Sequence, residues 1–152
     1  MLLTELLTPE RVKVPLVGRS KDEVLRELVE LALPDADASA KAAILDALQE
    51  RERVLSTGIG DGVAIPHAKT PLVDNLIVAV GLAESPIEYD ALDGRPAELF
   101  FLLLGPEAAA GAHLKTLSRI SRLLRREAFR DALRSAPDGP ALYAVIQDSE
   151  AA

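Results

Sequence analysis

Residues 51–69 read R-E-R-V-L-S-T-G-I-G-D-G-V-A-I-P-H-A-K, with glycines at the alternate positions 58, 60 and 62. Glycines at this spacing permit positive φ angles and let backbone amides approach a ligand closely. The apolar residues 63–65 that follow are too few for a helix, so they predict a short buried strand. Pro66 has no N–H to donate, so we expect the strand to stop there and to leave His67 at its end. The segment therefore predicts a rigid mounting for one imidazole.

The rest of the chain alternates between helical and strand patterns. Ser20 and Glu23 form a capping box, which predicts a helix that ends before Pro34. Continuous apolar runs at 76–82 and 98–104 predict buried strands. The other expected elements are a helical turn at 2–7, an edge strand at 12–16, helices at 39–51, 113–124, 127–135 and from 140, and a frayed tail from 148. This order predicts an α/β (α+β) fold with helices packed on a sheet, without saying which strands are parallel.

Composition limits the possible functions. A length of 152 residues predicts a single domain, residues 1–152, with a substantial core. The net charge of −7 and the lack of a basic run argue against nucleic acid and favour partners with a basic rim. The absence of cysteine excludes disulfides and thiol catalysis. No signal peptide and no apolar stretch of membrane-spanning length is present, so we expect a cytoplasmic protein without membrane insertion.

Three polar residues are expected at the edge of the core. His67 and His113 are the two histidines of the chain, and His113 falls in the first turn of its helix, on the face of the apolar residues. Arg51 lies in the last turn of the helix before the glycine segment. Each has a structural interpretation: a hydrogen-bonded core histidine, or an arginine that interacts with the helix dipole. The alternative is that the three act together on an anion.

The residue types favour one chemistry over others. Metal binding needs more ligands than His67 and the nearby Asp61 supply, and no His-x-x-x-His spacing occurs, so we expect no metal. No Gly-x-Ser-x-Gly motif suggests a serine hydrolase, and no cofactor is expected. A neutral imidazole can instead accept a phosphoryl group on one nitrogen while the other donates to a carbonyl. The glycine amides, Arg51 and a donor from His113 would surround that group.

The run S-T-G-I-G-D-G-V-A-I-P-H, preceded by R-E, and the later run H-L-K-T-L-S-R-I-S-R-L-L resemble the enzyme IIA domains of the bacterial phosphotransferase system, of the fructose, mannitol and nitrogen-regulatory class. The resemblance extends from L-L-T-P-E through D-G-R-P-A-E-L-F-F-L-L-L-G-P to the final helix. It implies one mixed sheet of about five strands with helices on both faces. It also implies a relay, in which the carrier protein HPr phosphorylates His67 at Nε2 and His67 passes the group to a cysteine of an enzyme IIB. Arg51 and His113 would support the phosphorylated ring.

Two points qualify the resemblance. Ala68 stands where the family usually has glycine, and its methyl group could narrow access or require a negative φ. Ile65, Ala68 and Leu114 would form an apolar docking patch around His67. The alternative function is that of the nitrogen-type members, which act by binding a regulatory target according to their phosphorylation state and have no sugar permease of their own.

Overall fold

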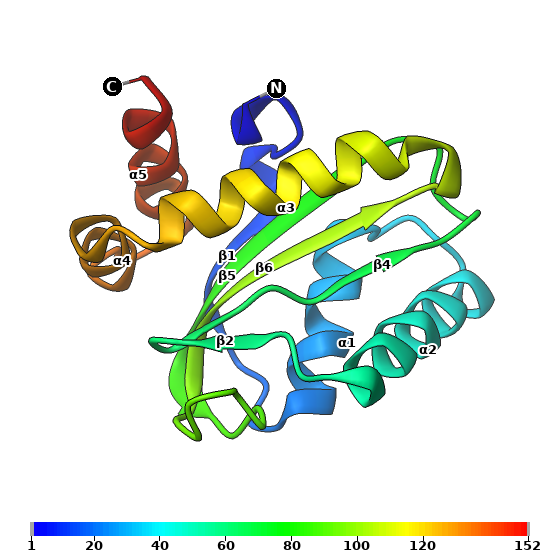
Figure 1. Ribbon diagram of the computed structural model, residues 1–152, viewed down its shortest axis with the longest axis horizontal. Helices are drawn as coiled ribbons and strands as arrows, with labels where there is room; N and C mark the ends of the chain where they lie inside the picture. Colours follow the sequence, from blue (N-terminus) through cyan, green and yellow to red (C-terminus); the bar gives the residue numbers. More distant parts are fainter. Residues whose placement is uncertain (1, 152) are drawn as a thin grey trace.

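A computed structural model describes residues 2–151, so Met1 and Ala152, the outermost residues of the predicted domain, lie outside it. Within the described residues, six strands form one mixed sheet with helices on both faces, one strand more than the five expected (Figure 1). The strands are β1 (Val12–Leu16), β2 (Gly58–Gly60), β3 (Val63–Ala64), β4 (His67–Lys69), β5 (Ile77–Ile87) and β6 (Ala97–Gly105). The helices are α1 (Lys21–Ala32), α2 (Ala38–Val54), α3 (Ala110–Leu124), α4 (Glu127–Arg134) and α5 (Gly139–Ala151), with 3-10 turns η1 (Leu3–Glu5), η2 (Pro9–Arg11) and η3 (Glu107–Ala109).

The sheet is built around the antiparallel pair β5 and β6. β1 lies parallel to β5 at one edge, as expected for the strand that contains Pro15. On the other side, β6 pairs in parallel with β3 and then with β4, and β2 runs antiparallel to β3. The strand order is therefore β1-β5-β6-β3-β2, with β4 also beside β6. The register pairs His67 with Leu103, close to the carboxyl end of β6.

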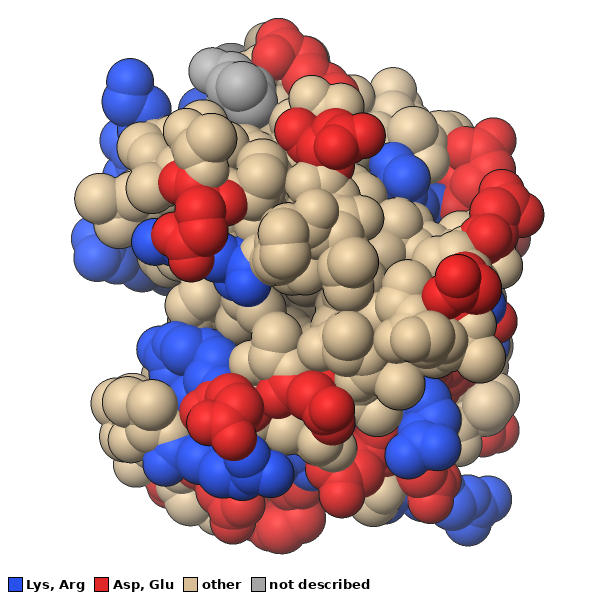
Figure 2. Space-filling model, turned by 90° about the vertical axis from the view of Figure 1, so that its right-hand side faces the viewer, with Lys and Arg blue, Asp and Glu red and all other residues tan. Residues whose placement is uncertain are grey.

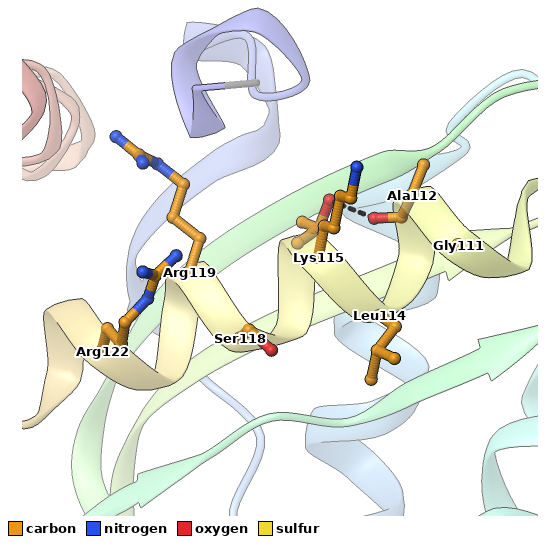
Figure 3. Close-up of a pocket in the computed structure, with 8 residues that line it drawn as sticks. Gly111, Ala112, Leu114, Lys115, Ser118, Arg119 and Arg122 are labelled. Carbon is orange, nitrogen blue, oxygen red and sulfur yellow. Dashed lines mark hydrogen bonds between the residues drawn. The ribbon is translucent and has the colours of Figure 1, made fainter.

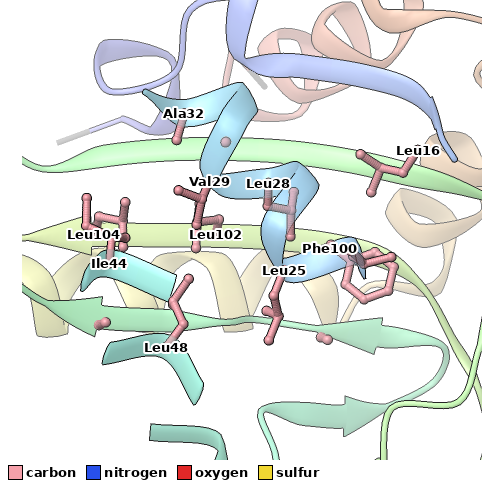
Figure 4. Close-up of a cluster of buried hydrophobic side chains, with 14 of the residues drawn as sticks. Leu16, Leu25, Leu28, Val29, Ala32, Ile44, Leu48, Phe100, Leu102 and Leu104 are labelled. Carbon is pink, nitrogen blue, oxygen red and sulfur yellow. The ribbon is translucent and has the colours of Figure 1, made fainter. Parts of the chain in front are cut away.

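Both faces of the sheet are buried. Along β6, Phe100, Leu102 and Leu104 face α1 and α2, whereas Leu99, Phe101 and Leu103 face α3, α4 and α5. Figure 4 shows the first of these two cores, in which α1 and α2 pack onto the sheet. Each fully buried leucine or phenylalanine contributes roughly 1.5–3 kcal/mol, so the six consecutive apolar residues of β6 anchor the molecule. A strand that is buried on both faces explains why this run shows no alternation of polar and apolar residues.

The ends of the helices follow from capping. The Ser20 hydroxyl accepts from the Glu23 amide at 3.2 Å, as predicted, and α1 begins at the next residue. Asp37 caps α2 by accepting from the Ala40 amide at 2.8 Å. α2 continues to Val54, a little beyond its predicted end, and Arg51 lies in its last turn as expected. None of the helices in residues 2–151 is long and apolar enough to cross a membrane.

One expectation about chain segments is confirmed and another is wrong. β3 ends at Ala64, before Pro66, and His67 lies at a strand end as predicted, because it is the first residue of β4. The Pro66 carbonyl accepts from the Leu103 amide at 3.0 Å, a contact that needs no N–H from proline. The residues from 148, by contrast, are not frayed, since α5 continues to Ala151. The Glu150 carboxylate, 1% exposed, accepts from the amides of Leu3 at 2.7 Å and Thr4 at 3.0 Å and so fixes the last turn of α5 against η1.

Candidate functional site

A groove of about 690 Å³ opens between α2, β4 and the start of α3. Figure 1 shows β4 between these helices, and Figure 2 shows that side of the molecule, where uncharged residues form a band between charged groups. Arg51, His67 and His113, which sequence analysis placed on three separate elements, all line the groove. The remaining lining residues are Ala47, Ala68, Lys69, Ala110, Gly111, Leu114 and Leu117.

His67 is the first residue of β4, and a local hydrogen bond orients its half-buried ring. The Nδ1 atom lies 2.8 Å from the carbonyl oxygen of Ile65, two residues earlier. A carbonyl can only accept, so Nδ1 carries the proton and the Nε2 atom of the neutral ring has a free lone pair. The backbone thus selects the tautomer that leaves Nε2 available as a nucleophile.

The surroundings of His67 keep its ring neutral. Burial has the largest effect on its pKa and lowers it from the ordinary value of 6.5. The hydrogen bond to Ile65 and the charge of Glu52 act in the opposite direction, while the positive charges of Arg51 and Lys69 lower the pKa further. The net shift is downward, so His67 is uncharged at pH 7 and its lone pair is not blocked by a proton.

His113 lies in the first turn of α3 as predicted, and it is only 3% exposed. Its ring centroid is 5.9 Å from that of His67, with the ring planes at 61°. Burial lowers the pKa of His113, and the charge on a protonated His67 lowers it further. Its Nδ1 atom is buried and has no hydrogen-bond partner among the described residues. An unpaired buried nitrogen costs roughly 1–3 kcal/mol, so the fold keeps His113 here against a local penalty.

Gly105, the last residue of β6, leaves room for the Leu76 side chain and lies against the His113 ring. A Cβ atom at this position would lie 2.4 Å from Cδ2 of Leu76 and 3.2 Å from Nδ1 of His113. The first distance is far below any normal contact between carbon atoms. Glycine therefore avoids an overlap with Leu76 and a tight contact with the imidazole at this strand end.

Arg51 has the predicted structural role, and its position keeps the second interpretation open. Its Nη1 donates to the carbonyl of Leu55 at 2.8 Å, which closes the carboxyl end of α2 and places a cation at the negative end of the helix dipole. The side chain also lines the groove with His67. A guanidinium has five N–H donors, so this one hydrogen bond leaves capacity for an anion.

The turn that carries Arg51 is held by its neighbour Glu52. The Glu52 side chain is 6% exposed, pairs with Lys21 at 3.0 Å, and accepts from the amide and the hydroxyl of Thr57. The Ser56 hydroxyl donates to the carbonyl of Tyr89 at 2.9 Å. These polar contacts fix the loop that links α2 to β2.

The glycine segment lies away from the groove. Gly60 and Gly62 have φ angles of +99° and +76° and form the tight turn between β2 and β3. This turn lies beside the start of β6, whereas His67 pairs with Leu103, four residues further along, which is roughly 13 Å. The prediction that glycine amides surround a group on His67 is therefore wrong. Asp61, the carboxylate considered as a metal ligand, lies on this same distant turn. Nowhere in residues 2–151 do three His, Cys, Asp or Glu side chains gather closely enough to hold a metal ion.

Sequence analysis missed Lys69 as a lining residue. It lies two residues after His67, and on a strand that spacing places both side chains on the same side, so the period of two was the available signal. The predicted apolar patch is only partly formed: Leu114 is 66% exposed, but Ile65 is buried in the core under α3. Ala68 packs into the opposite core and does not have a positive φ, so its methyl group requires no strained backbone.

Comparisons with known proteins identify the family of the chain. The family model described as "Phosphoenolpyruvate-dependent sugar phosphotransferase system, EIIA 2" matches residues 5–149. The chain belongs to this family. One enzyme IIA relative, the nitrogen regulatory protein of Pseudomonas aeruginosa, is 43% identical over 149 residues, which cover 96% of this chain and 95% of the relative. A second, the fructose-specific EIIABC component of Bacillus subtilis, is 38% identical over 150 residues, which cover 99% of this chain but 24% of that protein. Among solved structures, the nitrogen regulatory protein IIA-Ntr of Neisseria meningitidis superposes with a TM-score of 0.86 at 30% identity and covers 95% of this chain and 98% of its own.

Proposed function

We propose that this enzyme IIA protein is a phosphoryl carrier, acting as one cytoplasmic domain, in which Nε2 of His67 accepts the group from an HPr-like phosphohistidine donor. The observation that carries the proposal is the hydrogen bond from Nδ1 of His67 to the Ile65 carbonyl, because it leaves the Nε2 lone pair free in the groove. The lowered pKa of His67 supports it, since a protonated ring could not attack.

The transfer exchanges one nitrogen–phosphorus bond for another. The Nε2 lone pair attacks the phosphorus atom of the donor phosphohistidine, the donor bond breaks, and its electron pair stays on the donor nitrogen. The Nδ1 proton of His67 does not move, and its bond to the Ile65 carbonyl stabilises the positive charge that develops on the ring. In the second step a cysteine thiolate of an enzyme IIB attacks the phosphorus atom, and the electron pair returns to Nε2.

The other groove residues supply electrostatics. Arg51 and Lys69 bring two positive charges to the groove, and each stabilises the doubly charged phosphoryl oxygens without taking part in bond making. His113 lies beside the His67 ring and offers a ring N–H to the same oxygens. Ala110 and Gly111 add the positive end of the α3 dipole.

The test of the carrier function is the intact mass of the protein after incubation with phosphoenolpyruvate, enzyme I and HPr. Wild type is expected to gain one acid-labile phosphoryl group, His67→Gln none, and His113→Gln the same single group as wild type. No gain by wild type, or an equal gain by His67→Gln, would exclude His67 as the acceptor.

A second candidate concerns the destination of the phosphoryl group. The relatives that match this chain over nearly their whole length include proteins named nitrogen regulatory proteins, which favours a regulatory role, in which a target protein distinguishes the two forms of His67. The fructose-specific relative keeps the sugar-uptake role open. A purified enzyme IIB domain separates the two: rapid loss of the group from phosphorylated His67 to its cysteine supports sugar uptake, and retention of the group supports regulation.

A further inference from the structure

The charge of the protein is divided unevenly between its parts. Residues 110–134, which include α3 and α4, hold seven Lys and Arg and two Asp and Glu. The remaining residues hold ten Lys and Arg and twenty-two Asp and Glu. A region of net charge +5 therefore belongs to a molecule whose other parts sum to −12.

Three of these cations form a row on α3, which we call the basic row: Lys115, Arg119 and Arg122. They are four and seven residues apart, which places them on one face of a helix over about 10 Å. Figure 3 shows the three side chains on one side of α3, with Leu114 and Ser118 directed to another side. They line a hollow of about 710 Å³ along the helix.

The members of the row differ in how they are held. Arg119 donates to the carboxylate of Glu150 at 2.7 Å, which fixes the middle of the row. Lys115 and Arg122 are exposed, and within the described residues no carboxylate lies within ion-pair distance of either. The row therefore presents one unpaired cation on each side of an immobilised arginine. Exposed arginines with unused donors are enriched at protein interfaces.

We propose that the basic row is a docking surface for a protein partner whose own surface carries a row of carboxylates. The row is continuous with the groove, because Gly111 and the exposed Leu114 line both hollows. A partner that docks on the row reaches the first turn of α3 beside His113. Opposite charges on the two surfaces accelerate the encounter and fix its orientation.

The charge distribution selects a protein rather than a nucleic acid. A nucleic acid is a long polyanion, and outside residues 110–134 it would meet parts of the molecule whose charges sum to −12. An acidic patch on a folded protein is short enough to pair with the row alone. The overall composition favoured partners with a basic rim. For this one surface, the proposal replaces that expectation by a partner with acidic residues.

The docking surface rests on the proposed carrier function only for its role in the cell. Binding at the basic row can therefore be tested separately from phosphoryl transfer. The probe is a synthetic helical peptide with glutamates four and seven residues apart, titrated into the ¹⁵N-labelled protein at low salt. We expect shifts in the amide signals of α3 between Lys115 and Arg122. The double variant Lys115→Glu/Arg122→Glu should weaken binding at least about fivefold, from two exposed ion pairs of roughly 0.5 kcal/mol each.

The matched control is Arg19→Glu/Arg26→Glu, which makes the same change of net charge at exposed positions near α1. It should bind the peptide within about twofold of wild type, as expected for screened distant charges. If both double variants weaken peptide binding equally, the effect comes from overall charge and the proposal is overturned. The absence of shifts in the amide signals of α3 would also overturn it. Tighter binding of a short DNA duplex, lost in the first double variant, would replace the protein partner by nucleic acid. Phosphorylation of His67, measured by mass on the same samples, is expected to be unchanged, so a failure of the carrier function is seen independently.

Discussion

The imidazole rings of His67 and His113 lie with their centroids 5.9 Å apart and their planes at 61°, one ring from the edge of the sheet and the other from the first turn of α3. Burial lowers the pKa of both, and a charge on His67 further lowers the pKa of His113. The pair therefore remains neutral at pH 7. In the proposed transfer, a doubly negative phosphoryl group beside the rings would reverse this balance and favour protonation of His113.

We expect His113→Gln to retain phosphorylation of His67 but to slow onward transfer about tenfold to a hundredfold, the effect of losing one hydrogen bond to a charged group worth roughly 1.5–3 kcal/mol. The measurement is the rate of phosphoryl loss to a purified enzyme IIB domain. Leu114→Ala, at the neighbouring exposed position, is the control for altered docking. Unchanged transfer by His113→Gln would show that the second ring only fills space.

Stability should fall as the pH drops through the ordinary histidine range. The unfolded chain takes up protons near pH 6.5, whereas the folded histidines, with lowered pKa values, do not. The free energy of unfolding therefore decreases below pH 6.5 by at most about 1.4 kcal/mol per pH unit for each histidine, until the folded pKa values are reached. Urea denaturation between pH 7.5 and 5.5 should give a smaller slope for His113→Gln than for wild type. Glu27 and Glu150 do not interfere, because their lowered pKa values start from 4.5.

Arg51→Ala should shorten the lifetime of phosphorylated His67 or slow its transfer, because the groove loses one of its two cations. Arg51→Lys keeps the charge but not the planar guanidinium, so we expect partial recovery. The matched control is Arg53→Ala, because Arg53 lies two residues later on α2 and pairs with Glu50 on the surface. The readout is the decay of the phosphorylated mass with time, and equal decay in all four proteins contradicts the electrostatic role.

Gly105→Ala should destabilise the protein by about 1–3 kcal/mol, the usual result of overpacking a core position. The new Cβ would overlap Leu76 and press on the His113 ring. Gly111→Ala, where nothing lies within 4 Å of the new methyl group, is expected to be neutral or to stabilise α3 by up to about 1 kcal/mol. The measurement is the thermal unfolding of both variants. A loss of stability in Gly105→Ala alone indicates a steric requirement for glycine at that position. Equal losses in the two variants would indicate that this region is sensitive to any substitution.

Glu150→Gln should destabilise the protein by about 1–3 kcal/mol, the cost of weakening a buried set of charged hydrogen bonds. Burial alone would raise the pKa of Glu150, but the hydrogen bonds from Arg119, Leu3 and Thr4 hold it below 4.5. This stability is present above pH 4.5 and is lost as the pH falls through the lowered pKa. Wild type should therefore lose more stability than the variant between pH 5 and 3, measured by urea denaturation. The exposed Asp148→Asn is the control, and an effect as large as that of Glu150→Gln would argue against the specific contact.

The sequence was informative where a pattern reports burial directly. The capping box at Ser20 and the apolar run of β6 predicted their elements because local propensity and packing agree there. Three of the polar residues that line the groove, Arg51, His67 and His113, could be named as well, since each interrupts or ends an apolar stripe, whereas Lys69 was missed. Their roles in phosphoryl transfer stay predictions.

The errors arose where contacts distant in sequence decide the structure. Glu150 gives no local sign that it binds the amides of Leu3 and Thr4, almost the full length of the chain away. The glycine turn was assigned to the site because it is close to His67 in sequence, yet the parallel register of β3 and β4 along β6 separates the two. Pairing partners of short strands cannot be obtained from one segment alone.

The bond between Nδ1 of His67 and Ile65 also limits the order of events. The ring cannot turn over without breaking it, so Nε2 remains on the side of the ring away from Ile65. In the proposed relay, donor and acceptor therefore use the same groove between α2 and α3 and take turns there. This predicts kinetics of the substituted-enzyme type, with parallel double-reciprocal plots, and slower discharge when dephosphorylated donor is present in excess.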